Sequence, residues 1–95
     1  MIEVQAETAR ITIRGHARFG PPGRDIVCAA ASALCEVLRQ QYGGKTGYGR
    51  AEIPVVGQTE TAAAVMRTFR ELERAYPEHV RVAEPFFFEG KQHDS

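Results

Sequence analysis

Two short stretches near the start of the chain alternate between apolar and polar side chains, over residues 2–5 and 9–14. A period of two is the pattern of a β-strand that buries one of its faces. We therefore predict two strands, joined by a tight turn near Glu7 and Thr8. Glycines and prolines then punctuate residues 15–23, which predicts a loop.

Two longer segments repeat apolar side chains at three- and four-residue steps, the pattern of amphipathic helices. Asp25 is a good N-cap for the first segment, and Gly43 and Gly44 are suited to end it. Pro77 stops the second segment. The predicted helices run from Asp25 to about Tyr42 and from Thr59 or Glu60 to Tyr76.

Two further strands complete the predicted order ββαβαβ. One is the stretch RAEIPVV over residues 50–56, where Pro54 indicates a sheet edge or a bulge. The other is indicated by Val80 and Val82 near the end of the chain. The glycine-rich residues 43–49 are expected to form a flexible connection.

The simplest architecture for this order is an α+β fold, in which both helices pack on one face of a mixed or antiparallel sheet. We expect a single domain over residues 1–84, because a chain of 95 residues is large enough for one small core. Residues 85–95 are expected to form a partly disordered C-terminal tail.

Composition and charge narrow the possible functions. With 43% hydrophobic and 25% charged residues, the chain resembles an ordinary globular protein. Its 12 Lys and Arg residues are balanced by 12 Asp and Glu residues, so we expect no direct binding of nucleic acid. The sequence has no apolar run of the roughly 20 residues that span a membrane. It also lacks the pattern of a signal peptide, so we expect a cytoplasmic protein.

The two cysteines, Cys28 and Cys35, both fall in the first predicted helix. A separation of seven residues on a helix is about 10 Å, whereas a disulfide requires Cα atoms within about 7 Å. We therefore predict two free thiols, as is usual in a reducing compartment. Cys35 lies near the apolar side of the helix and is interpreted as a buried structural thiol.

His16 and Cys28 are the candidate reactive residues. Cys28 falls in the first turn of the first predicted helix, where unpaired N–H groups and the helix dipole favour a thiolate. His16 follows the second strand, and the loop after it returns to the start of this helix. This order can bring a nucleophile and its base together. The amides of Cys28 and its neighbours are then candidates to hold an oxyanion.

Spacing alone leaves a plainer interpretation open. Cysteines are often simply buried, and a histidine after a strand is often only a polar loop residue. A metal site has even less support, because two ligands are too few and His79, His93 and Cys35 show no recognisable ligand spacing. We expect neither a cofactor nor a metal ion.

Two motifs carry a family likeness. GHA at residues 15–17 and DIVCAAASAL at residues 25–34, with a glycine-containing loop between them, resemble motifs of the ribosomal-processing cysteine proteases called Prp. The resemblance extends over about residues 1–83. It implies a small cytoplasmic enzyme that removes the N-terminal extension of a large-subunit ribosomal protein during ribosome assembly. It also implies a homodimer.

The resemblance implies roles for individual residues. His16 of GHA matches the catalytic histidine, and Cys28 matches the nucleophile. The loop FGPPGR contains Gly20 and Gly23, which are the expected flexible positions of a segment that closes over the substrate. Its double proline is a departure from the family, because it stiffens a segment that the family usually keeps flexible.

Asp25 and Ser32 match supporting positions of the same motif. Ser32 follows Cys28 by one turn on the same helix face, from which it can touch the thiol or hold a water near it. The sequence leaves open whether Asp25 caps the helix or orients His16, and capping is the plainer interpretation.

Two other functions compete with peptide hydrolysis. A non-catalytic ribosome-assembly or binding factor on the same fold would tolerate loss of the Cys28 thiol. Redox sensing by Cys28 would give reversible oxidation that does not depend on His16.

Overall fold

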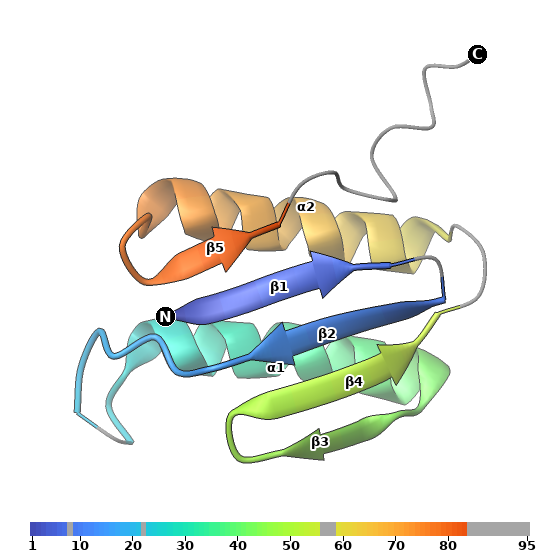
Figure 1. Cartoon of the computed structure of the whole chain (residues 1–95), viewed down its shortest axis with the longest axis horizontal. Helices are drawn as coiled ribbons and strands as arrows, with labels where there is room; N and C mark the ends of the chain where they lie inside the picture. Colours follow the sequence, from blue (N-terminus) through green and yellow to red (C-terminus); the bar gives the residue numbers. More distant parts are fainter. Residues whose placement is uncertain (8, 22, 56–58, 84–95) are drawn as a thin grey trace.

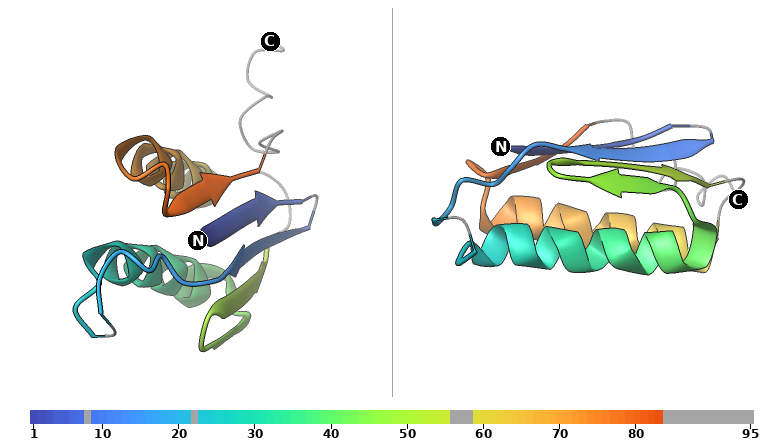
Figure 2. Two further views of the ribbon diagram at one scale, coloured as in Figure 1. Left: turned by 60° about the vertical axis from the view of Figure 1, so that its left-hand side comes forward. Right: turned by 90° about the horizontal axis from the view of Figure 1, so that it is seen from below.

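The computed structural model describes residues 1–7, 9–21, 23–55 and 59–83. Within these residues the chain forms two layers, a five-stranded mixed sheet and two helices that cover one face of it (Figure 1 and Figure 2). The predicted α+β class, with both helices on one face, is confirmed. The predicted tail over residues 85–95 and the second proline of the loop lie outside the described residues.

The sheet has the order β3-β4-β2-β1-β5. Its neighbouring strands run antiparallel, except that β1 and β5 run parallel. The elements are β1 (Ile2–Ala6), β2 (Arg10–Arg14), α1 (Ile26–Tyr42), β3 (Lys45–Gly47), β4 (Arg50–Pro54), α2 (Glu60–Ala75) and β5 (Val80–Val82). Because β5 pairs with β1, the last described strand lies beside the first.

The core lies between the sheet and the helices. Alternate residues of the strands, such as Val4 and Ile11, are buried beneath the helices, as their spacing predicts. The helices contribute Leu38 and Phe69, both fully buried. Burying a side chain of this size contributes roughly 1.5–3 kcal/mol. The apolar stripe of each helix therefore fixes it to the sheet.

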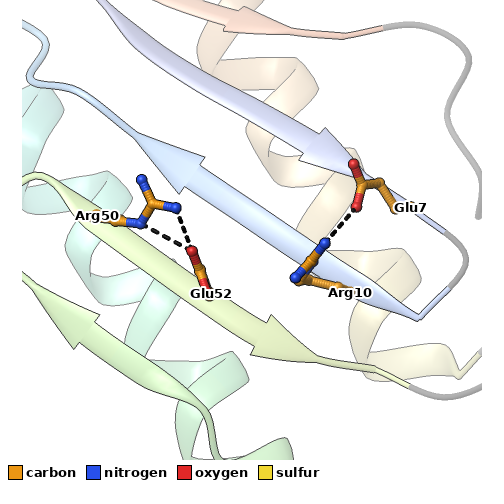
Figure 3. Close-up of polar contacts among 4 residues, drawn as sticks. All are labelled: Glu7, Arg10, Arg50 and Glu52. Atoms are coloured by element: carbon orange, nitrogen blue, oxygen red, sulfur yellow. Dashed lines mark hydrogen bonds and ion pairs between the residues drawn. The ribbon is translucent and has the colours of Figure 1, made fainter.

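The opposite face of the sheet is polar and carries no helix among the described residues. Two ion pairs lie on it, Glu7 with Arg10 and Arg50 with Glu52 (Figure 3). Exposed pairs of this kind contribute about 0–1 kcal/mol each. An antiparallel sheet commonly has one solvated face, and this face therefore is not a second core.

Two predictions about the sheet are wrong. The connection predicted over residues 43–49 contains strand β3, so the order gains one strand. The residues of β3 are all exposed and carry no apolar alternation, and pairing with β4 alone makes them a strand. Pro54 marks neither an edge strand nor a bulge, because β3 and β2 flank β4 and its register with β2 is continuous from Pro54 to Arg50. A proline is tolerated at position 54 because the pairing of β4 with β3 ends at Glu52, so no hydrogen bond to β3 requires a backbone N–H at position 54.

Candidate active site

The end of β2 and the start of α1 lie at the same end of the molecule, on the left in Figure 1. The amide N–H of Ala17, the residue directly after His16, donates to Sγ of Cys28 over 3.3 Å. The predicted return of the loop to the helix start is therefore confirmed. A cleft of about 840 Å³ opens here, and both His16 and Cys28 line it together with the β3–β4 turn.

Cys28 is the third residue of α1 and is half-buried at the cleft wall. Its sulfur accepts the hydrogen bond from Ala17, which is itself only 1% exposed. The Ala17 amide thus holds the Cys28 sulfur at the start of α1, facing the cleft.

The ring of His16 lies on the other side of the cleft. It packs against Tyr48 of the β3–β4 turn, with 4.4 Å between the ring centroids. The carbonyl of His16 accepts a hydrogen bond of 2.6 Å from the amino group of Met1. Among the described residues no hydrogen bond joins the His16 ring to Cys28, although the two side chains share the cleft.

Glycines hold the chain close to His16 on two sides. Gly15 has a φ of +94°, and a Cβ there would lie 2.2 Å from the carbonyl oxygen of Met1. Gly49 has a φ of +73°, and a Cβ there would lie 2.7 Å from Nε2 of His16. The N–H of Gly15 also donates to the carbonyl of Gly49 over 2.9 Å. Both the GHA motif and the β3–β4 turn therefore require glycine at these positions.

Asp25 is the N-cap of α1, which is the plainer of its two predicted roles. Its Oδ1 accepts from the amides of Val27 and Cys28, and its Oδ2 accepts from those of Phe19 and Gly20. Partial burial would raise the pKa of Asp25, but the four amide donors outweigh it and lower the pKa to about 2. The carboxylate thus joins the helix to the loop.

These bonds bear on the expected oxyanion donors. The amides of Val27 and Cys28 donate to the Asp25 side chain, and the amide of Ala29 donates to the Asp25 carbonyl. These three amides therefore already have partners in this structure. The Ala17 amide, which belongs to the loop rather than to the helix, is the donor that points at the sulfur.

Arg18 has a φ of +56°, and it is the one residue other than glycine with a positive φ among the described residues. This conformation is costly for a residue with a side chain and is common at functional sites. On one side of Arg18 the Ala17 amide donates to sulfur, and on the other side the Phe19 amide donates to Asp25. The positive φ of Arg18 thus lies between two amides that both bond to residues at the start of α1.

The structure places the other predicted residues as follows. Ser32 is exposed and lines the cleft one turn after Cys28, with no hydrogen bond between the two in the described part of the chain. Gly20 is half-buried through its bond to the cap, whereas Gly23 is exposed with a φ of +84°. Cys35 is free like Cys28, as predicted, and burial raises its pKa to about 11.

Three contributors to the site were not found from the sequence. The Ala17 amide is a backbone group and has no signature in a sequence. Tyr48 stands in the segment TGYG, whose glycines indicated a turn but not its position opposite His16. His79, in the turn between α2 and β5, lies 2.8 Å through its Nδ1 from the carbonyl of Ala17.

Neither a metal site nor a membrane span is present in the described part of the chain. No group of three or more His, Cys, Asp and Glu side chains there is arranged to hold a metal ion. None of the described helices combines the length and the apolar character needed to cross a membrane.

The chain is similar in structure to two crystal structures of the essential ribosomal processing protease Prp from S. aureus. The first, with a covalently linked product peptide, is 22% identical, with a TM-score of 0.59 over 85% of this chain and 94% of the other. The second, with a substrate peptide, is 20% identical, with a TM-score of 0.58 over 86% of this chain and 95% of the other. At this level of identity the likeness establishes a shared fold.

The sequence supplies the family. No curated protein matches it. The family model of the cysteine protease Prp, however, matches residues 1–81, which is most of the chain. The chain therefore belongs to the Prp family of cysteine proteases.

Proposed function

We propose that this protein is a cysteine endopeptidase that removes the N-terminal extension of a large-subunit ribosomal protein during ribosome assembly. The observation that carries this proposal is the hydrogen bond from the Ala17 amide to Sγ of Cys28. It ties the strand end that bears His16 to the helix start that bears the thiol. The cleft of about 840 Å³ around them is of the size that binds ligands and peptides.

The substrate class is supported by the family. The S. aureus protein is a ribosomal processing protease whose structures contain a substrate peptide or a covalently linked product peptide. The family model covers both motifs of this chain, GHA and DIVCAAASAL. We extend the same class of substrate, an N-terminal extension of a ribosomal precursor, to this protein. Its expected cytoplasmic location and homodimeric state belong to the same proposal.

The reaction proceeds in two steps. The Cys28 thiolate attacks the scissile carbonyl carbon, and the C–N bond breaks as His16 gives a proton to the leaving amine. This leaves a thioester on Cys28 and releases one peptide product. His16 then takes a proton from water, and the resulting hydroxide attacks the thioester carbonyl. The C–S bond breaks, the second product leaves as a carboxylic acid, and the Cys28 thiolate and protonated His16 are restored. The His16 ring must come within about 3.2 Å of the reacting atoms, and such contacts often tighten only with substrate bound.

The Ala17 amide is the proposed oxyanion donor. In the resting enzyme it donates to the sulfur of Cys28. When that sulfur bonds to carbon, its negative charge moves to the former carbonyl oxygen, and the amide lies close enough to follow it. One such donor typically contributes about a hundredfold or more to the rate. Asp25 supports this arrangement by holding the next part of the loop through the amides of Phe19 and Gly20.

Ser32 and the loop have proposed supporting roles. Ser32 is exposed on the cleft wall, where its hydroxyl can hold a water near the thiol. The bonds between Asp25 and the loop end at Gly20. We propose that any closure of the loop over the substrate uses Gly23, which is exposed and at which a Cβ would meet no atom within 4 Å.

The test is a peptidase assay read by mass spectrometry. The substrate is a synthetic peptide with the N-terminal sequence of the ribosomal precursor from the same organism. We expect a single cut by the wild type, and a loss of at least about a thousandfold in rate for both Cys28→Ala and His16→Ala. Cys35→Ala is the matched control, because its thiol is two turns away and stays protonated.

The outcomes separate the competing functions. No cut by folded wild type would contradict the proposal. If the wild type and Cys28→Ala then bind the peptide equally well, the protein is a binding factor. Reversible oxidation of Cys28 that survives His16→Ala would instead support redox sensing.

A further inference from the structure

His79 lies outside both motifs, in the turn between α2 and β5, yet it reaches the loop that holds the thiol. We propose that His79 is a positioning residue for Cys28. Its imidazole fixes Ala17, and Ala17 in turn fixes the amide that donates to the sulfur. The consequence for turnover rests on the proposed peptidase function, whereas the effect on the thiol itself does not.

The first contact is a hydrogen bond between side chain and backbone. Nδ1 of His79 lies 2.8 Å from the carbonyl oxygen of Ala17. A carbonyl oxygen can only accept, so Nδ1 carries the proton in this pair. The amide of the same Ala17 donates to Sγ of Cys28 over 3.3 Å. Ala17 is thus held at both of its backbone polar groups, in a position that is 1% exposed.

The second contact is between rings. The ring of Phe19 packs edge-on against the ring of His79, with 5.3 Å between the centroids. It also packs edge-on against the ring of Tyr76, with 5.2 Å between the centroids. Both partners belong to the turn after α2. The loop is therefore docked on this turn at Ala17 and again at Phe19, on either side of Arg18.

His79 is itself held firmly in place. The backbone N–H of His79 donates to the carbonyl of Tyr76 over 2.9 Å, and the backbone carbonyl of His79 accepts from the N–H of Ile2 over 2.9 Å. The turn is thus anchored both to the end of α2 and to the start of β1. A side chain on such a rigid support can fix the position of its partner.

The backbone of the loop explains why such a support is needed. Arg18 has a φ of +56°, which residues other than glycine adopt only when their surroundings impose it. Without the bond from His79, the carbonyl of Ala17 loses this partner, and Ala17 is held at one of its backbone polar groups instead of two. The Ala17 amide would then be held less firmly against the sulfur.

Two substitutions separate the hydrogen bond from the ring contact. His79→Phe keeps a ring against Phe19 and removes the N–H donor. His79→Asn removes the ring and keeps an N–H at the same distance from the backbone as Nδ1. Glu78→Gln, at an exposed position of the same turn, is the matched control. His79→Leu also lacks the donor and replaces His79→Phe if that variant does not fold.

The primary measurement is the rate at which iodoacetamide alkylates Cys28 in the full chain, distinguished from Cys35 by mass spectrometry. The second is kcat and KM on the precursor peptide, and the third is the melting temperature. We expect His79→Phe to lower the alkylation rate and kcat by about tenfold, with little change in KM. His79→Asn should stay within about twofold of the wild type in both.

Each outcome decides the proposal. If folded His79→Phe has the same alkylation rate and the same kcat as the wild type, the proposal is overturned. An equal loss in His79→Asn would also overturn it, because the ring packing and not the hydrogen bond would then matter. Absence of cleavage by the wild type would refute the proposed peptidase function alone, since the alkylation rates would still decide the role of His79.

Discussion

Each end of the two-layer fold contains the start of one helix and a glycine with positive φ. At the site end, on the left in Figure 1, β2 runs into the loop before α1, and the β3–β4 turn lies beside it. At the far end α1 finishes and α2 begins. The two helices are similar in length, and each starts at an N-cap, Asp25 for α1 and Thr59 for α2.

The two caps differ in what they hold. The hydroxyl of Thr59 accepts from the amide of Ala62 and contacts the hydroxyl of Tyr42 at the end of α1. It therefore ties one helix to the other. The carboxylate of Asp25 accepts from two amides of its own helix and from two amides of the loop. An ordinary capping residue therefore also helps to build the site when its second oxygen lies within hydrogen-bond distance of loop amides.

The largest expected difference between the two ends follows removal of the caps. Asp25→Ala should lower kcat by about a hundredfold, because the loop that carries the Ala17 amide loses its attachment to α1. Thr59→Ala should cost about 1 kcal/mol of unfolding free energy and leave kcat unchanged. Peptide cleavage and thermal unfolding of both variants measure this. Equal losses of kcat in the two variants would show that Asp25 acts only through helix stability.

A smaller difference is expected at the glycines. Gly49→Ala places a Cβ against Nε2 of His16 at the site end, in addition to the strain of a positive φ. Gly43→Ala at the far end has a similar φ, +82°, and open space around it. Both should lose about 1–2 kcal/mol of stability. Only Gly49→Ala should also lose activity, by about tenfold, because it displaces the imidazole.

Activity assays of Gly49→Ala and Gly43→Ala at equal concentrations of folded protein distinguish backbone strain from the contact with His16. If Gly43→Ala loses as much activity as Gly49→Ala, the backbone strain is responsible and the contact with His16 is not. Unchanged activity in Gly49→Ala would mean that the His16 ring adjusts without cost to the reaction.

The smallest expected effect is a difference in acid sensitivity. The pKa of Asp25 is about 2 in the folded protein, below its ordinary value of 3.8. A carboxyl group whose pKa is lower in the folded than in the unfolded protein stabilises the fold. This stabilisation is complete when the pH is above the unfolded-state pKa, and it is lost as the pH falls through the folded-state pKa. Wild type should therefore lose stability between about pH 4 and about pH 2. Asp25→Asn should lose less over the same interval.

Urea unfolding at several pH values in this interval measures the effect. Asn is also a good N-cap, so the variant keeps the helix start while losing the carboxylate. Glu36 has a pKa of about 2 as well, through its bonds to Arg39 and Gln40, and this contribution remains in both proteins. Parallel pH profiles would mean that Asp25 does not contribute to acid sensitivity.

Much of this architecture was predictable, because short-range signals determine it. Asp25, the glycine pair at 43–44 and Pro77 bound the helices within one residue of where they lie. Alternation identified β1 and β2. The position of His16 after a strand and of Cys28 in a first helical turn was enough to predict that the strand end and helix start meet, and the Ala17 bond confirms it.

The remainder depends on contacts between segments distant in the sequence. β3 has no apolar pattern and exists because β4 pairs with it. The sequence predicts oxyanion donors in the first helical turn, but it does not reveal that the amides of Val27 and Cys28 donate to the Asp25 side chain. The contact of His79 with Ala17 has no local signal either, because the two residues are 62 positions apart in the sequence.

The parallel pairing of β1 with β5 has a consequence for the order of events during synthesis. Ile2 pairs with Val80, so after β1 leaves the ribosome nearly all of the described chain must follow before its neighbour β5 arrives. His79 emerges with that neighbour, and with it the support of Ala17. Translation proceeds from the N-terminus, so the thiol is made long before the turn that aligns it. On the proposed role of His79, the enzyme reaches its full rate only after this last strand has paired.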